Sequence, residues 1–114
     1  MLAKRNRIVT GPDYRRLVRS GRRARGTLTL AYARRTSPGD PMRLGVIVAR
    51  NVGNAVVRNK VRRRIKAVGW SLASEVDGVD VVVRALPSAS AAAFAQLDEE
   101  VRDHVRSLAA GRPR

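Results

Sequence analysis

Cysteine is absent from this 114-residue chain, and histidine occurs only once. Without thiols, neither a disulfide framework nor a thiolate metal site is possible, which excludes the pattern of a small secreted scaffold. The chain has no apolar run of about 18 residues, the length that a membrane-spanning helix requires. The basic opening at 1–7 leads into no apolar segment of the kind found in export signals. We therefore expect a cytoplasmic protein with no membrane partner.

Acidic and aromatic residues are also scarce. The 9 Asp and Glu residues oppose 24 Lys and Arg residues, which gives a formal net charge of +15. This excess is far above what solubility requires, and it implies a polyanionic partner. Arginine greatly outnumbers lysine, and because the guanidinium fork matches phosphates and stacks on bases, the expected partner is a nucleic acid. With only four aromatic residues, we expect one aliphatic core in a single domain over residues 1–114.

Charge is distributed unevenly along the chain. Nine basic residues and one acidic residue precede Gly26, and seven basic residues but no acidic residue lie in 50–66. Seven of the nine acidic residues lie in 75–103. We therefore expect the first two segments to face the polyanion and the C-terminal third to face away from it. Residues 1–9 form a basic N-terminal segment, and a disordered basic tail is expected at 111–114.

Hydrophobic periodicity predicts the element order α-β-β-α-β-α. The first helix opens at Thr10-Gly11-Pro12-Asp13 and ends near Gly21, because Thr or Gly can cap a helix start, Pro tolerates its first turn and Gly favours its end. Strands are expected at 28–32, 44–48 and 79–83, and two further helices at 55–72 and 91–108. A dense turn signal at 36–41 favours a β-hairpin between the first two strands. The predicted fold is an α+β two-layer sandwich.

The helix expected at 91–108 resembles ordinary core packing against a sheet. Its polar side holds His104 and four acidic residues within 98–103, away from the basic segments. We interpret this side as a solvated face, since no nucleophile signature lies beside His104 and a two-metal nuclease site is not indicated. No catalytic residue is predicted. The apolar stripe of this helix is Phe94, Leu97, Val101, Val105 and Leu108.

The helix expected at 55–72 is the most informative element. At about 100° per residue, its apolar stripe comprises Val57, Val61, Ile65, Val68 and Leu72, and its basic side comprises Arg58, Asn59, Arg62, Arg63 and Lys66, with Lys60 and Arg64 at the flanks. Like charges four residues apart destabilise an isolated helix by about 0.2–0.5 kcal/mol per pair, so a bound polyanion is the expected compensation. A simple solvated face is disfavoured, because such faces normally mix both signs. Trp70 either stacks on RNA or completes the core, and the core is favoured.

Two segments within 44–66 resemble the signature of the ribonuclease P protein subunit family. They are LGVIV at 44–48 and VGNAVVRNKVRRRIK at 52–66. KRNR at 4–7 and PDY at 12–14 also fit the family, so the resemblance covers nearly the whole chain. It implies an α/β sandwich shared with a domain of certain ribosomal proteins. It also implies a left-handed βαβ crossover, whereas the pattern alone would predict a right-handed one.

The same resemblance implies a function. The chain would be the non-catalytic protein subunit of ribonuclease P, binding the RNA subunit and precursor tRNA and promoting removal of the 5′ leader. Hydrolysis would be carried out by the RNA subunit with Mg²⁺ rather than at a protein metal site, and no small-molecule cofactor is expected. The basic helix and its preceding loop would bind the RNA subunit through Arg50, Asn54, Arg58, Asn59, Lys60, Arg62, Arg63 and Lys66.

A cleft between the first helix and the sheet would hold the single-stranded leader in this family. The matching positions are Tyr14, Val18, Leu30 and Tyr32, and Val18 stands where many relatives carry a second aromatic residue. Stacking of an unpaired base on an aromatic ring is worth about 1–3 kcal/mol. The alternative is that both tyrosines are half-buried core residues.

Three other classes of protein remain as alternatives. A ribosomal protein or general RNA chaperone needs basic residues but not the ordered run at 52–66. A helix-turn-helix DNA-binding protein needs two helices separated by a short turn, whereas strands are expected on both sides of the basic helix. A binder of anionic membranes needs an exposed apolar face opposite its cations, and here the sheet is expected to cover that face.

Overall fold

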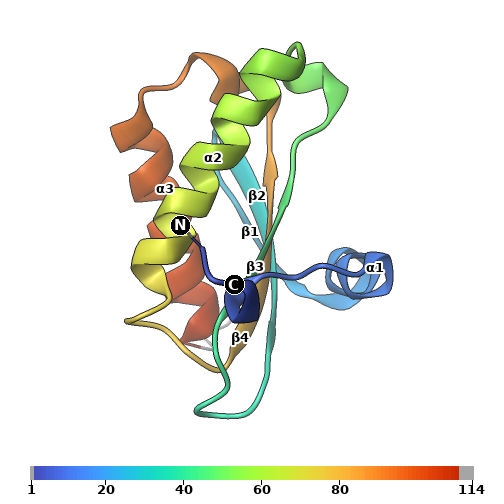
Figure 1. Cartoon of the computed structure of the whole chain (residues 1–114), viewed down its shortest axis with the longest axis vertical. Coiled ribbons are helices and arrows are strands. Elements are labelled where there is room, and N and C mark those ends of the chain that lie inside the picture. Colours follow the sequence, from blue (N-terminus) through green and yellow to red (C-terminus); the bar gives the residue numbers. More distant parts are fainter. Residues whose placement is uncertain (1, 111–114) are drawn as a thin grey trace.

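The computed structural model describes residues 2–110, which form a four-stranded mixed sheet and three α-helices (Figure 1). Two helices, α2 and α3, lie on one face of the sheet, and α1 lies on the other (Figure 1). No helix within 2–110 is long and apolar enough to span a membrane. The elements are α1 (Gly11–Ser20), β1 (Arg22–Arg25), β2 (Thr29–Arg35), β3 (Arg43–Ile47), α2 (Ala55–Leu72), β4 (Val79–Ala85) and α3 (Phe94–Ala109), with short 3-10 turns η1 (Lys4–Asn6), η2 (Arg50–Val52) and η3 (Pro87–Ala91).

The predicted hairpin between the strands now labelled β2 and β3 is wrong. The strand order is β1-β2-β4-β3, so β4 lies between them, antiparallel to β2 and parallel to β3. The reason lies in the sequence of β4, whose residues Val79, Val81, Val82 and Val83 are all fully buried. A strand with apolar side chains on both faces is stable only in the middle of a sheet covered on both sides. The strand–helix–strand unit β3-α2-β4 is present, and its left-handed course stays a prediction.

The periodicity missed β1 and placed the start of α3 too early. Only Ala24 of β1 points into the main core, and the other three residues are arginines. An edge strand tolerates such a composition, because charge on an edge also prevents pairing with other chains. Ala91, the predicted start of this helix, is the last residue of η3, and α3 begins at Phe94. The tail predicted at 111–114 lies outside the described residues.

The main core lies between the sheet and helices α2 and α3. The predicted stripe of α2 is buried except for Val57, which is half-buried. The stripe of α3 is also buried, apart from Phe94, which is 42% exposed. Phe94 occupies the first turn of α3, and the centre of its ring lies 6.0 Å from the guanidinium carbon of Arg64. Full burial of one such aliphatic side chain contributes about 1.5–3 kcal/mol, so these two stripes hold both helices against the sheet.

Helix α1 begins and ends where the sequence predicts. The Thr10 hydroxyl accepts a hydrogen bond from the amide of Asp13 at 3.3 Å, and the amide of Gly21 donates to the carbonyl of Leu17 at 2.8 Å. Its buried side contributes to a second, smaller cluster comprising Ile8, Leu17, Tyr32 and Val82. The helix is therefore fixed to the sheet face opposite α2.

The N-terminal segment lies along the outer edge of β3. The Asn6 side-chain amide donates to the carbonyl of Met42 at 2.7 Å, and the amide of Ile8 donates to the carbonyl of Leu44 at 3.0 Å. Leu2 and Ile8 are buried on opposite sides of the sheet. The segment thus closes part of an edge strand and places Arg7 between α1 and α2, which the sequence did not reveal.

Candidate nucleic-acid interface

The basic helix begins at a defined cap. The amide of Val57 donates to the Asn54 side-chain oxygen at 3.0 Å, so the amide group of Asn54 positions the first turn of α2. Arg50 lies in the preceding turn η2 and is exposed. The structure therefore places both predicted loop residues beside the start of the helix, with the oxygen of Asn54 already engaged.

The cations predicted on α2 lie along one side of the helix. Lys60 and Arg63 are exposed together with Asn59, whereas Arg58, Arg62 and Lys66 are half-buried. Arg62 donates to the side-chain oxygen of Asn59 at 2.8 Å. This set of five cations with Asn59 is called the α2 basic face below.

Acidic residues do not neutralise the α2 basic face. Within residues 2–110, the arginines in ion pairs are Arg34, Arg43, Arg102 and Arg106, none of which lies on α2. Arg102 and Arg106 on α3 pair with Asp98 and Glu75 at 3.0 and 2.9 Å. Asp98 and Glu75 are thus engaged on the α3 side, and the positive charge of α2 is left available to a polyanion.

The four residues predicted for the leader cleft come together on the opposite face of the sheet. Tyr14, Val18 and Leu30 are half-buried and pack against the smaller cluster, of which Tyr32 is a member. Tyr32 is only 5% exposed, so its ring is mainly a core ring. Tyr14 has more free surface, and beside it runs a hollow formed with Val18 and Ile47.

Tyr14 is held by β3. Its hydroxyl accepts a hydrogen bond from the amide of Val46 at 3.2 Å, which occupies a free donor on the edge of the strand. Its ring lies directly over Gly45, where a Cβ atom would come within 2.6 Å of the ring. Because a real Cβ atom does not approach so closely, only glycine at position 45 allows the ring to lie against the strand.

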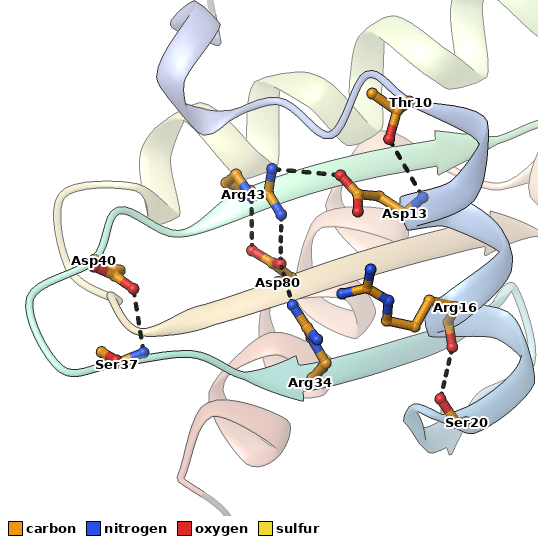
Figure 2. Close-up of polar contacts among 9 residues, drawn as sticks. All are labelled: Thr10, Asp13, Arg16, Ser20, Arg34, Ser37, Asp40, Arg43 and Asp80. Carbon is orange, nitrogen blue, oxygen red and sulfur yellow. Dashed lines mark hydrogen bonds and ion pairs between the residues drawn. The ribbon is translucent and has the colours of Figure 1, made fainter.

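A charge network fixes α1 over the sheet (Figure 2). Arg43 of β3 donates two hydrogen bonds to Asp80 of β4 at 2.9 and 2.7 Å, and it lies 3.7 Å from Asp13 of α1. Arg34 of β2 approaches Asp80 at 3.8 Å (Figure 2). Asp80 is 2% exposed, so its charge depends on these partners. Hydrogen bonding to Asp80 raises the pKa of Arg43 despite its partial burial.

Three arginines that were not predicted as site residues from the sequence also border the cleft. Arg23 pairs across the sheet with Tyr32, and Arg25 and Arg84 both pair with Leu30. Directly paired residues point to the same face of a sheet, so all three arginines lie on the cleft side. The signal in the sequence was the alternation around Ala24, which becomes informative only once the strand register is known.

The two surfaces meet at the N-terminal segment. One hollow is lined by Tyr14, Val46, Arg62 and Lys66 together with Arg7. It therefore connects the cleft side, through Tyr14, with the α2 basic face, through Arg62 and Lys66. Arg7 was predicted only as part of a basic segment, and the structure places it at this junction.

The solvated acidic face predicted for α3 is confirmed for Glu99 and Asp103, which are exposed, and is wrong for Glu100. The carboxylate of Glu100 accepts hydrogen bonds from the amides of Thr27 and Leu28 at 2.9 and 3.1 Å and from the hydroxyl of Thr29 at 2.5 Å. Burial raises the pKa of Glu100, but these bonds and the nearby His104 outweigh burial and hold the pKa below its usual range. Since Glu100 holds the β1–β2 turn and Asp98 pairs with Arg102, these carboxylates do not fit a two-metal site. His104 is buried beside Glu100.

The expectation that Trp70 completes the core is wrong. Trp70 is 58% exposed, although its neighbours Val68, Gly69 and Leu72 are buried. Its position on the helix places it on the side of Arg63 and Lys66, away from the sheet. The position of residue 70 on the helix thus determines its exposure, although tryptophan is usually well buried.

Comparisons with known proteins identify the family of this chain. A family model described as Ribonuclease P matches residues 2–109. The chain is 46% identical over 107 residues to the ribonuclease P protein component of Clavibacter michiganensis subsp. michiganensis, covering 92% of this chain and 94% of that protein. It is 43% identical over 117 residues to the same component of Pseudarthrobacter chlorophenolicus, covering 99% and 86%.

The solved structures give the same result. The RNase P protein of Staphylococcus aureus superposes with a TM-score of 0.81 at 26% identity, covering 90% of this chain and 94% of that one. The RNase P protein of Thermotoga maritima shares the fold, with a TM-score of 0.76 at 23% identity, covering 87% and 94%. From the extent of these matches, we conclude that the chain belongs to the ribonuclease P protein family.

Proposed function

We propose that this chain binds the RNA subunit of ribonuclease P through the α2 basic face and the 5′ leader of precursor tRNA through the cleft beside α1. The single observation that carries this proposal is the α2 basic face itself. Four of its five cations lie opposite a buried apolar stripe and Lys60 lies at the flank, and within residues 2–110 no acidic residue forms an ion pair with them. Repulsion among these cations is relieved when phosphates bind.

The proposed leader site combines one available ring with several cations. Tyr14 offers a partly exposed ring, and the arginines at 23, 25 and 84 border the same side of the sheet. Single-stranded nucleic acids bind to such a combination, because cations follow the backbone while aromatic rings stack on bases. Tyr32 lies too deep for a stacking platform, so its part in this site is to support the ring of Tyr14 and the side chain of Leu30.

We assign the chemistry of hydrolysis to the RNA subunit with Mg²⁺, within a cytoplasmic ribonucleoprotein. The buried or paired carboxylates of this chain support that division, because Glu100, Asp98 and Asp80 are each engaged in contacts that hold the fold. The chain contributes binding: its cations screen the repulsion between two RNA molecules, and this effect is expected to shrink when salt or Mg²⁺ is high.

The test is cleavage of a precursor tRNA by the ribonuclease P RNA of Clavibacter michiganensis at low Mg²⁺, with and without this protein. We expect strong stimulation by the wild-type chain. A triple variant with Arg58, Arg62 and Arg63 changed to Ala should lose it, because it removes three of the five cations of the α2 basic face.

A control variant with the same change in net charge is available outside the α2 basic face. Arg35→Ala, Arg102→Ala and Arg106→Ala also remove three positive charges, and two of these arginines are already paired with acidic residues. This control should stimulate cleavage as the wild-type chain does. Tight RNA binding without stimulation would contradict the proposal and would favour a general RNA chaperone.

A further inference from the structure

The surface around Trp70 is not explained by folding. Trp70 is the only tryptophan of the chain, and its side chain is more exposed than that of Phe94. Exposing a ring of this size forgoes the stabilisation that its burial would provide. The two hydrophobic residues on either side of it in α2, Val68 and Leu72, are fully packed, so the helix had a buried side on which a tryptophan could have been placed.

Trp70 lies in line with the α2 basic face. At 3.6 residues per turn, it is rotated from Arg63 by about 20° and from Lys66 by about 40° around the helix axis. Lys66 lies about one turn before it and Arg63 about two turns before it. The ring therefore continues the row of cations toward the C-terminal end of α2 instead of forming a separate apolar patch.

A hollow of about 450 Å³ opens beside the ring. Leu2 and Ala67 give it an apolar floor, and Arg7, Arg63 and Lys66 contribute cations to its walls. All of the residues that line it are apolar or basic. A flat apolar surface surrounded by cations suits a nucleobase attached to a phosphate backbone, because the base stacks on the ring while the phosphates lie against the cations.

We propose that Trp70 is a stacking site for an unpaired base of the RNA that binds the α2 basic face. The inference rests on the proposed function, since the same RNA occupies both parts of α2. A membrane surface fits less well, because insertion needs a broad apolar face, whereas here a single ring lies among cations. An acidic protein would pair with the cations but would not need an exposed ring at this position.

The ring itself reports on its contact with RNA. Since the chain has one tryptophan, its intrinsic fluorescence arises mainly from this side chain. Titration with the ribonuclease P RNA of Clavibacter michiganensis should quench this fluorescence and protect it from acrylamide. Trp70→Leu should weaken RNA binding about tenfold, which corresponds to about 1.4 kcal/mol, whereas Trp70→Phe should retain most of the affinity.

Phe94→Leu is the matched control, because it removes an exposed aromatic ring from the start of α3, outside the α2 basic face. It should bind RNA as the wild-type chain does. Equal binding by Trp70→Leu and Trp70→Phe, or fluorescence that RNA leaves unchanged while it binds, would overturn the stacking site and leave the proposed function intact. Quenching that depends on protein concentration without RNA would also overturn it, in favour of self-association. Failure of the wild-type chain to bind this RNA at all would instead reject the proposed function, and the stacking site with it.

Discussion

The dependence of RNA binding on salt should report directly on the α2 basic face. Each phosphate neutralised by a cation adds about 0.7–0.9 to the slope of log affinity against log salt concentration. Replacing Arg58, Arg62 and Arg63 by Ala removes three cations of this face, so the slope should fall in magnitude by about 2–3. Because Arg58 and Arg62 are half-buried, they have less surface available to phosphates, and we expect a change in slope toward the lower end of that range.

This change is large enough to measure. Between 50 and 200 mM salt, the affinity of the wild-type chain should fall about 20 times more than that of the triple variant. The assay is equilibrium binding of labelled ribonuclease P RNA at four or more salt concentrations. Circular dichroism of each variant checks that α2 is still folded, which is expected because the buried stripe of the helix is unchanged.

The variant with Arg35, Arg102 and Arg106 changed to Ala has the same net charge and distinguishes a local effect from a general one. Its slope should equal that of the wild-type chain, because Arg102 and Arg106 are paired with Asp98 and Glu75 on the α3 side. If the two triple variants lowered the slope equally, binding would follow overall charge, and the assignment of the α2 basic face would be refuted.

Three further outcomes follow from the contacts around the sheet. Asp80→Asn should lower the free energy of unfolding by about 2–3 kcal/mol in urea titrations, because it leaves Arg43 without its buried carboxylate; a change below about 0.5 kcal/mol would contradict this. Glu100→Gln should lower the free energy of unfolding by about 1–3 kcal/mol. The same change at the exposed neighbour, Glu99→Gln, should leave it almost unchanged. Since the pKa of Glu100 is lowered in the folded chain, its stabilisation is present above the ordinary value of 4.5 and is lost as the pH falls through the folded-state pKa; stability measured from pH 7 to 3 should therefore decline less in Glu100→Gln. Val18→Phe should tighten binding of a single-stranded leader oligonucleotide about tenfold by adding a ring beside the cleft, and unchanged affinity would exclude stacking there.

The sequence was sufficient where several local signals agreed. Helix α2 was predicted with both of its ends, because its apolar stripe has the helical period and ends at Leu72. The α2 basic face followed from the same wheel. The cap and end of α1 were equally readable from Thr10 and Gly21.

Features that depend on strand pairing were not readable in this way. Strand β4 lies in the centre of the sheet because both of its faces are buried. The turn signal at 36–41 instead favoured a hairpin that paired β2 directly with β3. The arginines beside the cleft became visible only with the register of β1 against β2. Glu100 was assigned to a solvated face, because its hydrogen bonds to the turn at 27–29 connect residues more than seventy positions apart.

The position of the N-terminal segment has a consequence for how two RNA strands could share this protein. Tyr14 contacts the edge strand β3 from the cleft side, while Lys66 approaches the same edge from α2, and both line one hollow with Arg7. A strand is about 4.7–4.9 Å wide in the plane of a sheet, which is shorter than the Debye length of about 8 Å at physiological salt. Under the proposed function, the leader and the RNA subunit would therefore approach each other here closely enough to repel. The cations at this junction act on both strands at once, so they should contribute more to cleavage than equally exposed cations elsewhere, and their contribution should vanish first as Mg²⁺ rises.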